Sequence, residues 1–255
     1  MLAEERRNLM VQALEAAGMM STEDLARQLG VSAETVRRDL VKLEQGGQIR
    51  RVHGGASRAS GFRGTEATFS ERAEAGAAAK QRIAALAAAL VRPGQTLSFD
   101  VGTTALAVAK ALPADYHGTV VTCSLLVACE LSGRAGIEVL VCGGRVRPGD
   151  LAVSNAQAVA FMKNVHADIG FLGSGGVSIE AAVTDYHLDE VATRRVLIAN
   201  SQRSYLLADS QKFGRVCAHR VCGYEEITAV ISDREPPAPL LRAIRTAGAD
   251  VLHPR

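Results

Sequence analysis

Glycine and polar side chains follow short apolar runs in the second part of the chain, where they could bind an anion. In "FDVGTTA", Asp100 precedes Gly102, Thr103 and Thr104 at the point where a strand would pass into a helix. Glycine lets the backbone approach closely, threonine hydroxyls donate hydrogen bonds, and free N–H groups at a helix start favour a phosphate. Lys212 in "LADSQKFG" supplies a cation after a later apolar run. These residue types predict a site for an anionic small molecule.

Further clusters lie at the same kind of position, and each alone is also typical of ordinary turns. "TCS" and "CGGRV" end two apolar runs, "FLGSGGVS" is a glycine-rich loop, and "DYHLDEVATRR" begins a helix with acidic side chains. Open α/β sheets bind ligands at the carboxyl ends of their strands, so we expect the clusters to converge. The predicted ligand-binding residues are Asp100, Gly102, Thr103, Thr104, Ser124, Gly173, Ser174, Gly175, Asp185, Glu190 and Lys212.

The elements that must position these residues form an α/β pattern. A helix is expected over residues 77–91, followed by the strand "TLSFDV". Helical segments then alternate with "GTVVTC", "IEVLVC", "ADIGFLG", "RSYLLAD" and "ITAVISD". Such alternation is typical of a mostly parallel sheet with helices on both faces. The predicted fold of this part is therefore α/β and Rossmann-like.

The beginning of the chain has a different pattern, that of a small winged helix-turn-helix. Helices are expected over residues 3–18, 22–29 and from residue 33 onward, where Ser32 can cap the third helix. A short basic strand over residues 49–52 then leads to a Gly-Gly pair. In this motif the second helix of the helix-turn-helix enters the major groove of DNA, and the wing lies along the phosphates.

The third predicted helix has one apolar face and one cationic face. Leu40 and Leu43 fall within about 40° of Val36 on a helical wheel, which leaves Arg37 and Arg38 on the free side. For a helix taken in isolation, an ordinary solvated face with Arg38 paired to the glutamate four residues earlier would be the better explanation of the arginines. The small domain around the helix favours DNA contact instead.

The charge of the first 63 residues is divided unevenly. Residues 4–34 contain six acids and three bases, whereas residues 37–63 contain seven bases and two acids, although the whole chain has a net charge of only +2. A concentrated basic region predicts a polyanionic partner, here double-stranded DNA. The predicted DNA-binding residues are Ser32, Glu34, Thr35, Arg37, Arg38, Arg50, Arg51 and His53.

Several other classes of protein are disfavoured. The acidic start "MLAEERRNLM" is unlike a signal peptide, and the run "IAALAAALV" is far shorter than the ~20 residues that span a bilayer. The five cysteines and six histidines show no metal-ligand spacing. A P-loop and a dinucleotide-binding G-x-G-x-x-G helix are missing. We therefore expect a cytoplasmic protein without a cofactor, a metal or a membrane partner.

The segment "STEDLARQLGVSAETVRRDLVKLEQGGQIRRVHGGA" resembles the winged helix of the DeoR family, and "FDVGTT", "TCS", "CGGRVRPGD", "ADIGFLGSGGVS" and "LADSQKFGR" resemble its effector domain in the same order. The resemblance covers nearly the whole chain. It implies a DNA-binding domain over residues 1–57, a linker over 58–76, and an effector domain over 77–255 with a fold similar to ribose-5-phosphate isomerase. Three positions depart from the family pattern, which usually has Asn at Cys123, often an acid at Gly175 and commonly Lys at Arg194.

The resemblance also implies a function: repression of a carbon-catabolism operon, relieved by a phosphorylated small-molecule effector, by a dimer or tetramer of the chain. "FDVGTT", "GSGG", "DYHLDEVATRR" and "DREPP" look most like the family branch that responds to glycerol-3-phosphate. Two alternatives remain open at this point, a catalytically active phosphosugar isomerase fused to a DNA-binding module and a transcriptional activator. The isomerase reaction needs a carboxylate base beside the reacting carbons, and "GSGG" does not supply one.

Overall fold

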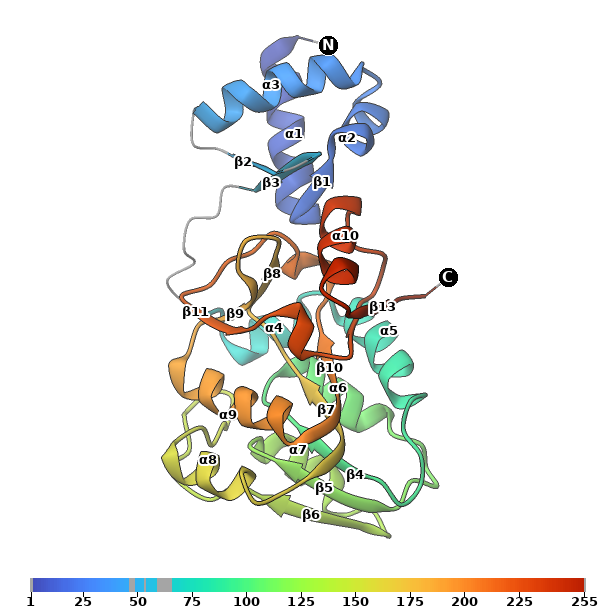
Figure 1. Ribbon diagram of the computed structural model, residues 1–255, viewed down its shortest axis with the longest axis vertical. Helices are drawn as coiled ribbons and strands as arrows, with labels where there is room; N and C mark the ends of the chain where they lie inside the picture. The colour runs from blue at the N-terminus through green and yellow to red at the C-terminus, as the bar shows by residue number, and fades with distance from the viewer. Residues whose placement is uncertain (1, 46–48, 53, 59–65, 255) are drawn as a thin grey trace.

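The N-terminal domain packs three helices on a small antiparallel sheet. The computed structural model describes residues 2–45, 49–52, 54–58 and 66–254 (Figure 1). The sheet has the strand order β1-β3-β2. The elements of this domain are α1 (Ala3–Ala17), β1 (Met19–Ser21), α2 (Thr22–Leu29), α3 (Ala33–Gln45), β2 (Ile49–Val52) and β3 (Gly55–Arg58). A winged helix-turn-helix is thus confirmed, with β1 as an additional strand that the sequence pattern did not predict.

Local chemistry explains where these helices begin and which face they bury. The Ser21 hydroxyl accepts a hydrogen bond from the Asp24 N–H at 3.0 Å and caps α2, and Ser32 accepts one from the Thr35 N–H at 3.3 Å before α3. The predicted apolar face of α3 is fully buried, whereas Arg37 and Arg38 are exposed. The core of the domain consists of Met10, Leu14, Leu25, Val36, Leu40, Leu43, Ile49 and Ala56.

The C-terminal domain is built on a seven-stranded parallel sheet with the order β13-β12-β10-β7-β4-β5-β6. The strands are β4 (Thr96–Phe99), β5 (Gly118–Thr122), β6 (Ile137–Val141), β7 (Ala167–Leu172), β10 (Ser201–Leu207), β12 (Ala229–Ile231) and β13 (Asp250–Leu252). The chain winds from β4 outward to β6 and then returns to β7, which pairs with the other side of β4. Between β4 and β7 lies the switch point at which sheets of this class bind ligands.

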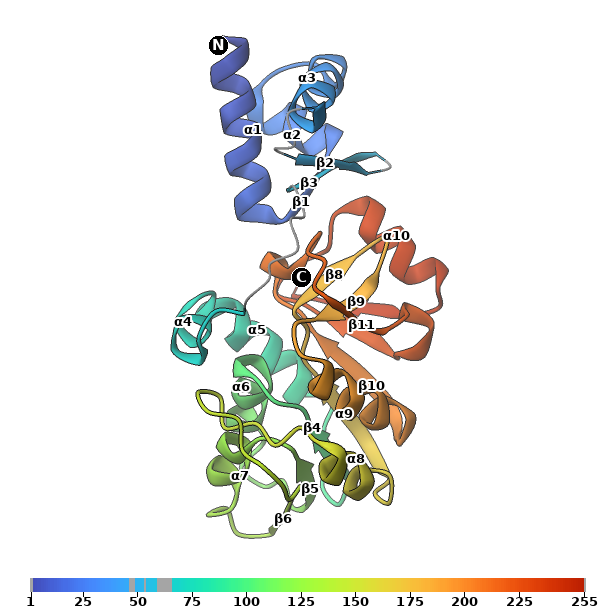
Figure 2. The same ribbon diagram turned by 90° about the vertical axis from the view of Figure 1, so that its left-hand side faces the viewer.

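Helices cover both faces of this sheet, as the sequence predicted (Figure 2). One face is packed by α5 (Ala77–Ala88), α6 (Thr103–Ala111) and α7 (Leu125–Leu131), whose apolar side chains form a core with Leu97, Phe99 and Phe171. The other face is packed by α8 (Ala156–Met162), α9 (Leu188–Ala199) and α10 (Ala238–Thr246). A layer of helices on each face of the sheet holds the strand ends in fixed positions, which makes them a suitable platform for a binding site.

Two smaller features complete the domain. A three-stranded antiparallel sheet, β11-β9-β8, extends from the main sheet toward the N-terminal domain and contains β8 (Gly176–Ser178), β9 (Ala182–Asp185) and β11 (His219–Cys222). Two short 3₁₀ helices cover Ser210–Lys212 and Tyr224–Glu226. The expected linker is partly helical, because Thr68 and Glu71 form a reciprocal capping box at the start of α4 (Phe69–Glu74).

The two domains touch through β1 and the turn that follows β10. Met19 is buried in the same apolar cluster as Phe213, and a Cβ at Gly18 would clash with the Phe213 carbonyl oxygen. Gly18 has a φ of 77°, so glycine satisfies both the backbone conformation and the close approach. In addition, the Arg50 Nε of β2 lies 3.8 Å from a carboxylate oxygen of Glu180 in the β8–β9 turn.

Candidate functional site

The switch point of the parallel sheet opens into a cavity of about 260 Å³. Asp100 follows β4 and Gly173 follows β7, and the Gly173 N–H donates to the Asp100 carboxylate at 2.8 Å. The Asp100 N–H in turn donates to the Phe171 carbonyl at 3.0 Å, so the two strand ends are held together. The cavity lining includes seven of the predicted ligand-binding residues: Gly102, Thr103, Thr104, Gly173, Ser174, Asp185 and Lys212.

The start of α6 forms one wall of the cavity. Gly102 occupies the capping position with a φ of 111° and gives no side-chain cap to the helix. The first N–H groups of any helix have no partner within the helix, and here no capping side chain provides one. These groups carry the positive end of the helix dipole. Thr103, Thr104 and Ala105 at this helix start all line the cavity. Free N–H groups, hydroxyls and a helix dipole together favour a phosphate or carboxylate group.

Basic side chains form the opposite wall. Lys80 of α5, Lys212 and Arg215 line the cavity, and none of them pairs with a carboxylate among the described residues. The Lys80 ammonium donates to the carbonyl oxygens of Arg72 and Ala75. Burial lowers the pKa of Lys80, and the nearby cations Lys212 and Arg72 act in the same direction, against Asp209. An anionic ligand would offset this concentration of positive charge.

Arg194 and Asp185 line the cavity and belong to a buried cluster of acids around Arg194 that extends behind it. The Arg194 guanidinium, 4% exposed, lies 2.5 Å from a carboxylate oxygen of Asp100, 2.5 Å from one of Asp185 and 2.9 Å from one of Glu190. Arg147 also pairs with Glu190. Burial raises the pKa of Glu190 to about 7, and the charges of Asp185 and Asp100 act in the same direction, against the two arginines. The cluster ties β4, β9 and α9 together beside the site.

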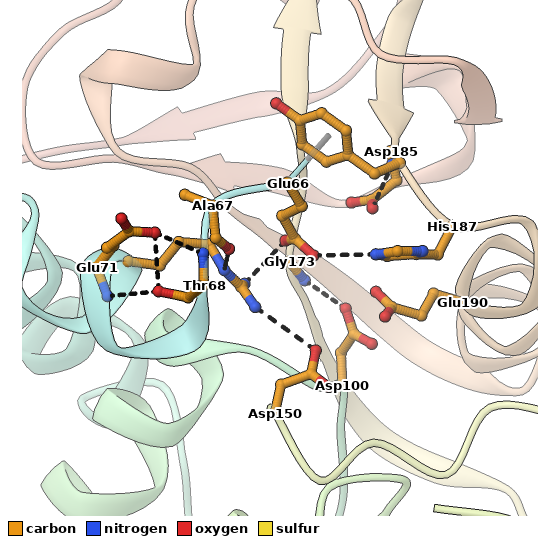
Figure 3. Close-up of polar contacts among 12 residues, drawn as sticks. Glu66, Ala67, Thr68, Glu71, Asp100, Asp150, Gly173, Asp185, His187 and Glu190 are labelled. Carbon is orange, nitrogen blue, oxygen red and sulfur yellow. Dashed lines mark hydrogen bonds and ion pairs between the residues drawn. The ribbon is translucent and has the colours of Figure 1, made fainter. Parts of the chain in front are cut away.

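The segment that enters the effector domain from the N-terminal domain also reaches the cavity (Figure 3). Glu66 lies 2.9 Å from the Arg72 guanidinium and 3.2 Å from Nε2 of His187, which precedes α9. Arg72 in turn lies 3.5 Å from Asp150, in the loop before α8. These ion pairs place a linker carboxylate at the cavity wall, although no local sequence pattern marks Glu66 or Arg72 as site residues.

Four predicted ligand-binding residues do not line the cavity. Asp100 and Glu190 stand behind it as partners of Arg194. The Ser124 hydroxyl caps α7 by accepting from the Val127 N–H at 3.2 Å. Gly175 is enclosed, because a Cβ there would lie 2.7 Å from the Cys217 sulfur. A side chain at Gly175, including the acid that the family often has there, finds no room in this chain.

The predicted DNA-binding face lies at the other end of the molecule, on α3 and the β2–β3 hairpin, opposite α1 (Figure 2). Ser32, Glu34, Thr35, Arg37 and Arg38 lie at or near the start of α3. Their side chains are exposed except for that of Thr35, which is half-buried. Arg38 forms no ion pair with the described residues, and Glu34 pairs with Arg37 instead, whose Nη1 lies 3.5 Å from a Glu34 carboxylate oxygen.

The basic strand β2 contributes the remaining DNA-binding candidates. Arg51 is exposed and lies 4.0 Å from Glu44 of α3, and Arg50 points to Glu180 of the effector domain. His53 lies outside the described residues. In the described part of the chain, no helix is long and apolar enough to cross a membrane, and no group of three or more acidic, His or Cys side chains is arranged to hold a metal ion.

Comparisons with known proteins agree with this two-domain architecture. The model of the DeoR-like helix-turn-helix domain matches residues 6–61, and that of the DeoR C-terminal sensor domain matches residues 76–234. The HTH-type transcriptional regulator GolR of Listeria innocua is 31% identical over 97% of both chains. The glycerol-3-phosphate regulon repressor of Escherichia coli is 31% identical over 94% of both chains.

Among solved structures, ribose 5-phosphate isomerase A of Methanocaldococcus jannaschii matches 55% of both chains with a TM-score of 0.41 and 14% identity. That similarity is too low to support an inference about function. The two family models together span most of the chain and coincide with its two structural domains. The chain therefore belongs to the DeoR family of transcriptional regulators.

Proposed function

We propose that the chain is a transcriptional repressor whose affinity for operator DNA falls when a phosphorylated small molecule occupies the cavity between β4 and β7. The observation that carries this proposal is the facing arrangement of the uncapped start of α6 and the unpaired cations Lys212 and Arg215. Helix N-termini and basic side chains are the groups that bind phosphate in proteins. The exposed arginines of α3 supply the DNA-binding half of the proposal.

Glycerol-3-phosphate is the effector that we propose first. The cavity of about 260 Å³ lies at the lower end of the range for small-molecule sites, which favours a ligand with few heavy atoms. The enclosed Gly175 leaves the glycine loop without an acid to read additional sugar hydroxyls. One relative named for a glycerol-3-phosphate regulon is 31% identical to this chain, and GolR is equally similar. Sequence identity therefore does not select this effector, and the proposal rests on the size and the lining of the pocket.

The ligand half of the proposal can be tested by calorimetry on the full chain with glycerol-3-phosphate, glycerol, and a panel of triose, pentose and hexose phosphates. We expect glycerol-3-phosphate to bind and glycerol not to bind, because the phosphate makes the contacts at α6. Thr103→Ala combined with Lys212→Ala should abolish binding. If a hexose phosphate binds and glycerol-3-phosphate does not, only the choice of effector is wrong. If no phosphate ester binds, the sensor function is wrong.

The DNA half requires duplex DNA selected by the wild-type protein from a random pool. The Arg37→Ala, Arg38→Ala double variant should bind it more weakly, and each lost phosphate contact should lower the salt dependence of binding by about one unit. Arg92→Ala, at an exposed position of the effector domain, is the matched control. Unchanged binding by the double variant would show that α3 is not the DNA-contacting helix.

Repression and its relief predict a linked equilibrium. Ligand should reduce DNA affinity by about 1–3 kcal/mol, which is roughly 5–150-fold, and DNA should reduce ligand affinity by the same factor. Fluorescence anisotropy of the DNA with and without glycerol-3-phosphate measures this coupling. An increase in DNA affinity with ligand would instead support an effector-dependent activator.

We also propose that the chain acts as a dimer or tetramer. One winged helix contacts only a few base pairs, so a specific operator requires two copies of the domain at half-sites separated by a helical turn or its multiples. Sedimentation equilibrium at micromolar concentration should give a mass at least twice the 26.9 kDa of the chain. A monomer that retains full operator affinity would contradict this proposal.

A further inference from the structure

Arg215 is a cation of the cavity wall that no acid among the described residues neutralises. Its side chain lines the cavity, and its Nε is buried without a hydrogen-bond partner. No ion pair to a described residue neutralises it, in contrast to Arg72 and Arg194, which line the same cavity and are both paired with acids. Burial lowers the pKa of Arg215, and Cys217 is the only neighbouring group that opposes this shift.

The backbone around Arg215 holds this side chain in place. The Arg215 N–H donates to the Lys212 carbonyl at 3.2 Å, and the Gly214 N–H donates to the Val177 carbonyl of β8 at 2.8 Å. Gly176 packs directly against Arg215, because a Cβ there would lie 2.8 Å from the Arg215 Cβ. The backbone of Arg215 is thus held in a hydrogen-bonded turn between Lys212 and β11, from which its side chain reaches the cavity wall.

A second polar group of the same cavity is also unsatisfied. The Ser174 Oγ, in the loop after β7, is buried and has no hydrogen-bond partner in the described part of the protein. A buried polar atom without a partner lowers stability, and an unpaired buried cation does so more strongly. Both atoms are enclosed by protein, so one anion with several acceptor oxygens in the cavity would satisfy Ser174 and Arg215 once their side chains turn toward it.

We propose that Arg215 is a ligand-binding residue that holds the anionic group of the effector, together with the start of α6, Lys212 and Ser174. This inference rests on the proposed sensor function and names its principal cation. A guanidinium presents a planar fork of N–H donors that matches two oxygens of a phosphate, which an ammonium cannot do. We take the ligand to be the phosphate monoester of the proposed function, and we assign to Arg215 the contact with two oxygens of its phosphate group.

The test compares Arg215→Met, Arg215→Lys and Arg220→Met with the wild type, using glycerol-3-phosphate and inorganic phosphate as probes in calorimetry. Arg220 is an exposed arginine of β11 outside the cavity lining, so its replacement controls for the loss of one positive charge. Arg215→Met should weaken binding by roughly tenfold or more, as expected for a charge-assisted hydrogen bond. Arg215→Lys should fall between Arg215→Met and the wild type, and Arg220→Met should remain within about twofold of the wild type.

The melting temperature without ligand separates binding from a structural role. Because this half-buried cation has no acid partner among the described residues, Arg215→Met should melt at or above the wild-type temperature. Weaker binding accompanied by a lower melting temperature would assign Arg215 a structural role and overturn the proposal. Unchanged binding by Arg215→Met, with a wild type that binds, would overturn it and leave the sensor function intact. A wild type that binds no phosphate ester would overturn the sensor function itself.

Discussion

Replacement of Arg194 by methionine tests the buried acid cluster most directly. Methionine keeps an unbranched apolar side chain but removes the guanidinium that contacts Asp100, Asp185 and Glu190. Glu190 retains its pair with Arg147, whereas no other arginine or lysine pairs with Asp100 or Asp185 in the described part of the chain. The variant therefore leaves two carboxylates buried without a cation.

The size of the effect follows from this arrangement. Removing one partner of a buried ion pair costs about 3–5 kcal/mol, because the remaining charge has lost both water and its partner. For a domain of this size, each kcal/mol lowers the melting temperature by about 2–4 °C, so we expect a decrease of roughly 6–20 °C at pH 7.5. The exposed Arg195 donates only to the backbone carbonyls of Val221 and Arg220, and Arg195→Met should cost about 1 kcal/mol.

Calorimetric or circular-dichroism melting at pH 7.5 measures this decrease. Further replacement of Asp100 and Asp185 by asparagine should recover part of the loss. If Arg194→Met melts within about 2 °C of the wild type at pH 7.5, the cluster does not stabilise the fold and the reasoning is wrong.

Three further predictions concern single residues. Burial raises the pKa of Glu190 from 4.5 to about 7, so between these pH values the folded state holds a proton that the unfolded state releases. The free energy of unfolding of the wild type should therefore fall by up to about 3 kcal/mol as the pH rises from 4.5 to 7. Urea unfolding of Glu190→Gln should show a weaker dependence of stability on pH, and identical pH dependences would contradict this. Ser21→Ala removes the α2 cap and should cost about 1 kcal/mol in urea unfolding, whereas no change would mean that water replaces the hydroxyl. Gly175→Asp should cost about 1–3 kcal/mol by crowding Cys217 and Tyr186, and a melting temperature equal to that of the wild type would show that the glycine loop can open.

The sequence allowed the positions of strand ends to be predicted because a parallel sheet brings them to one edge. Gly102, Thr103, Gly173 and Lys212 are far apart along the chain, yet each follows an apolar strand, and the structure places all four around one cavity. The exposed face of α3 could also be predicted from the sequence, because a period of 3.6 residues separates buried from exposed positions without reference to the rest of the fold.

Other parts of the site depend on contacts that leave no local pattern. Glu66 and Arg72 reach the cavity from a segment with no periodicity, and only the tertiary fold brings them to His187 and Asp150. Ser124 has the right position but its hydroxyl is occupied by the cap of α7. The strand β1 was missed for a similar reason, because three residues give no periodic signal and pair with β3 far along the chain.

The strand β1 has a consequence for anyone who would exchange the domains of such regulators. Met19 is buried in the effector-domain core, whereas its neighbour Met20 packs against the core of the winged helix, since successive side chains of a strand point to opposite sides. Two neighbouring residues of this strand therefore belong to two different hydrophobic cores. A chimera joined at the linker would carry Met19 with the DNA-binding domain, and the new effector domain would have no apolar surface shaped to bury it. Successful grafts should require matched residues at the Phe213 turn as well as a compatible linker.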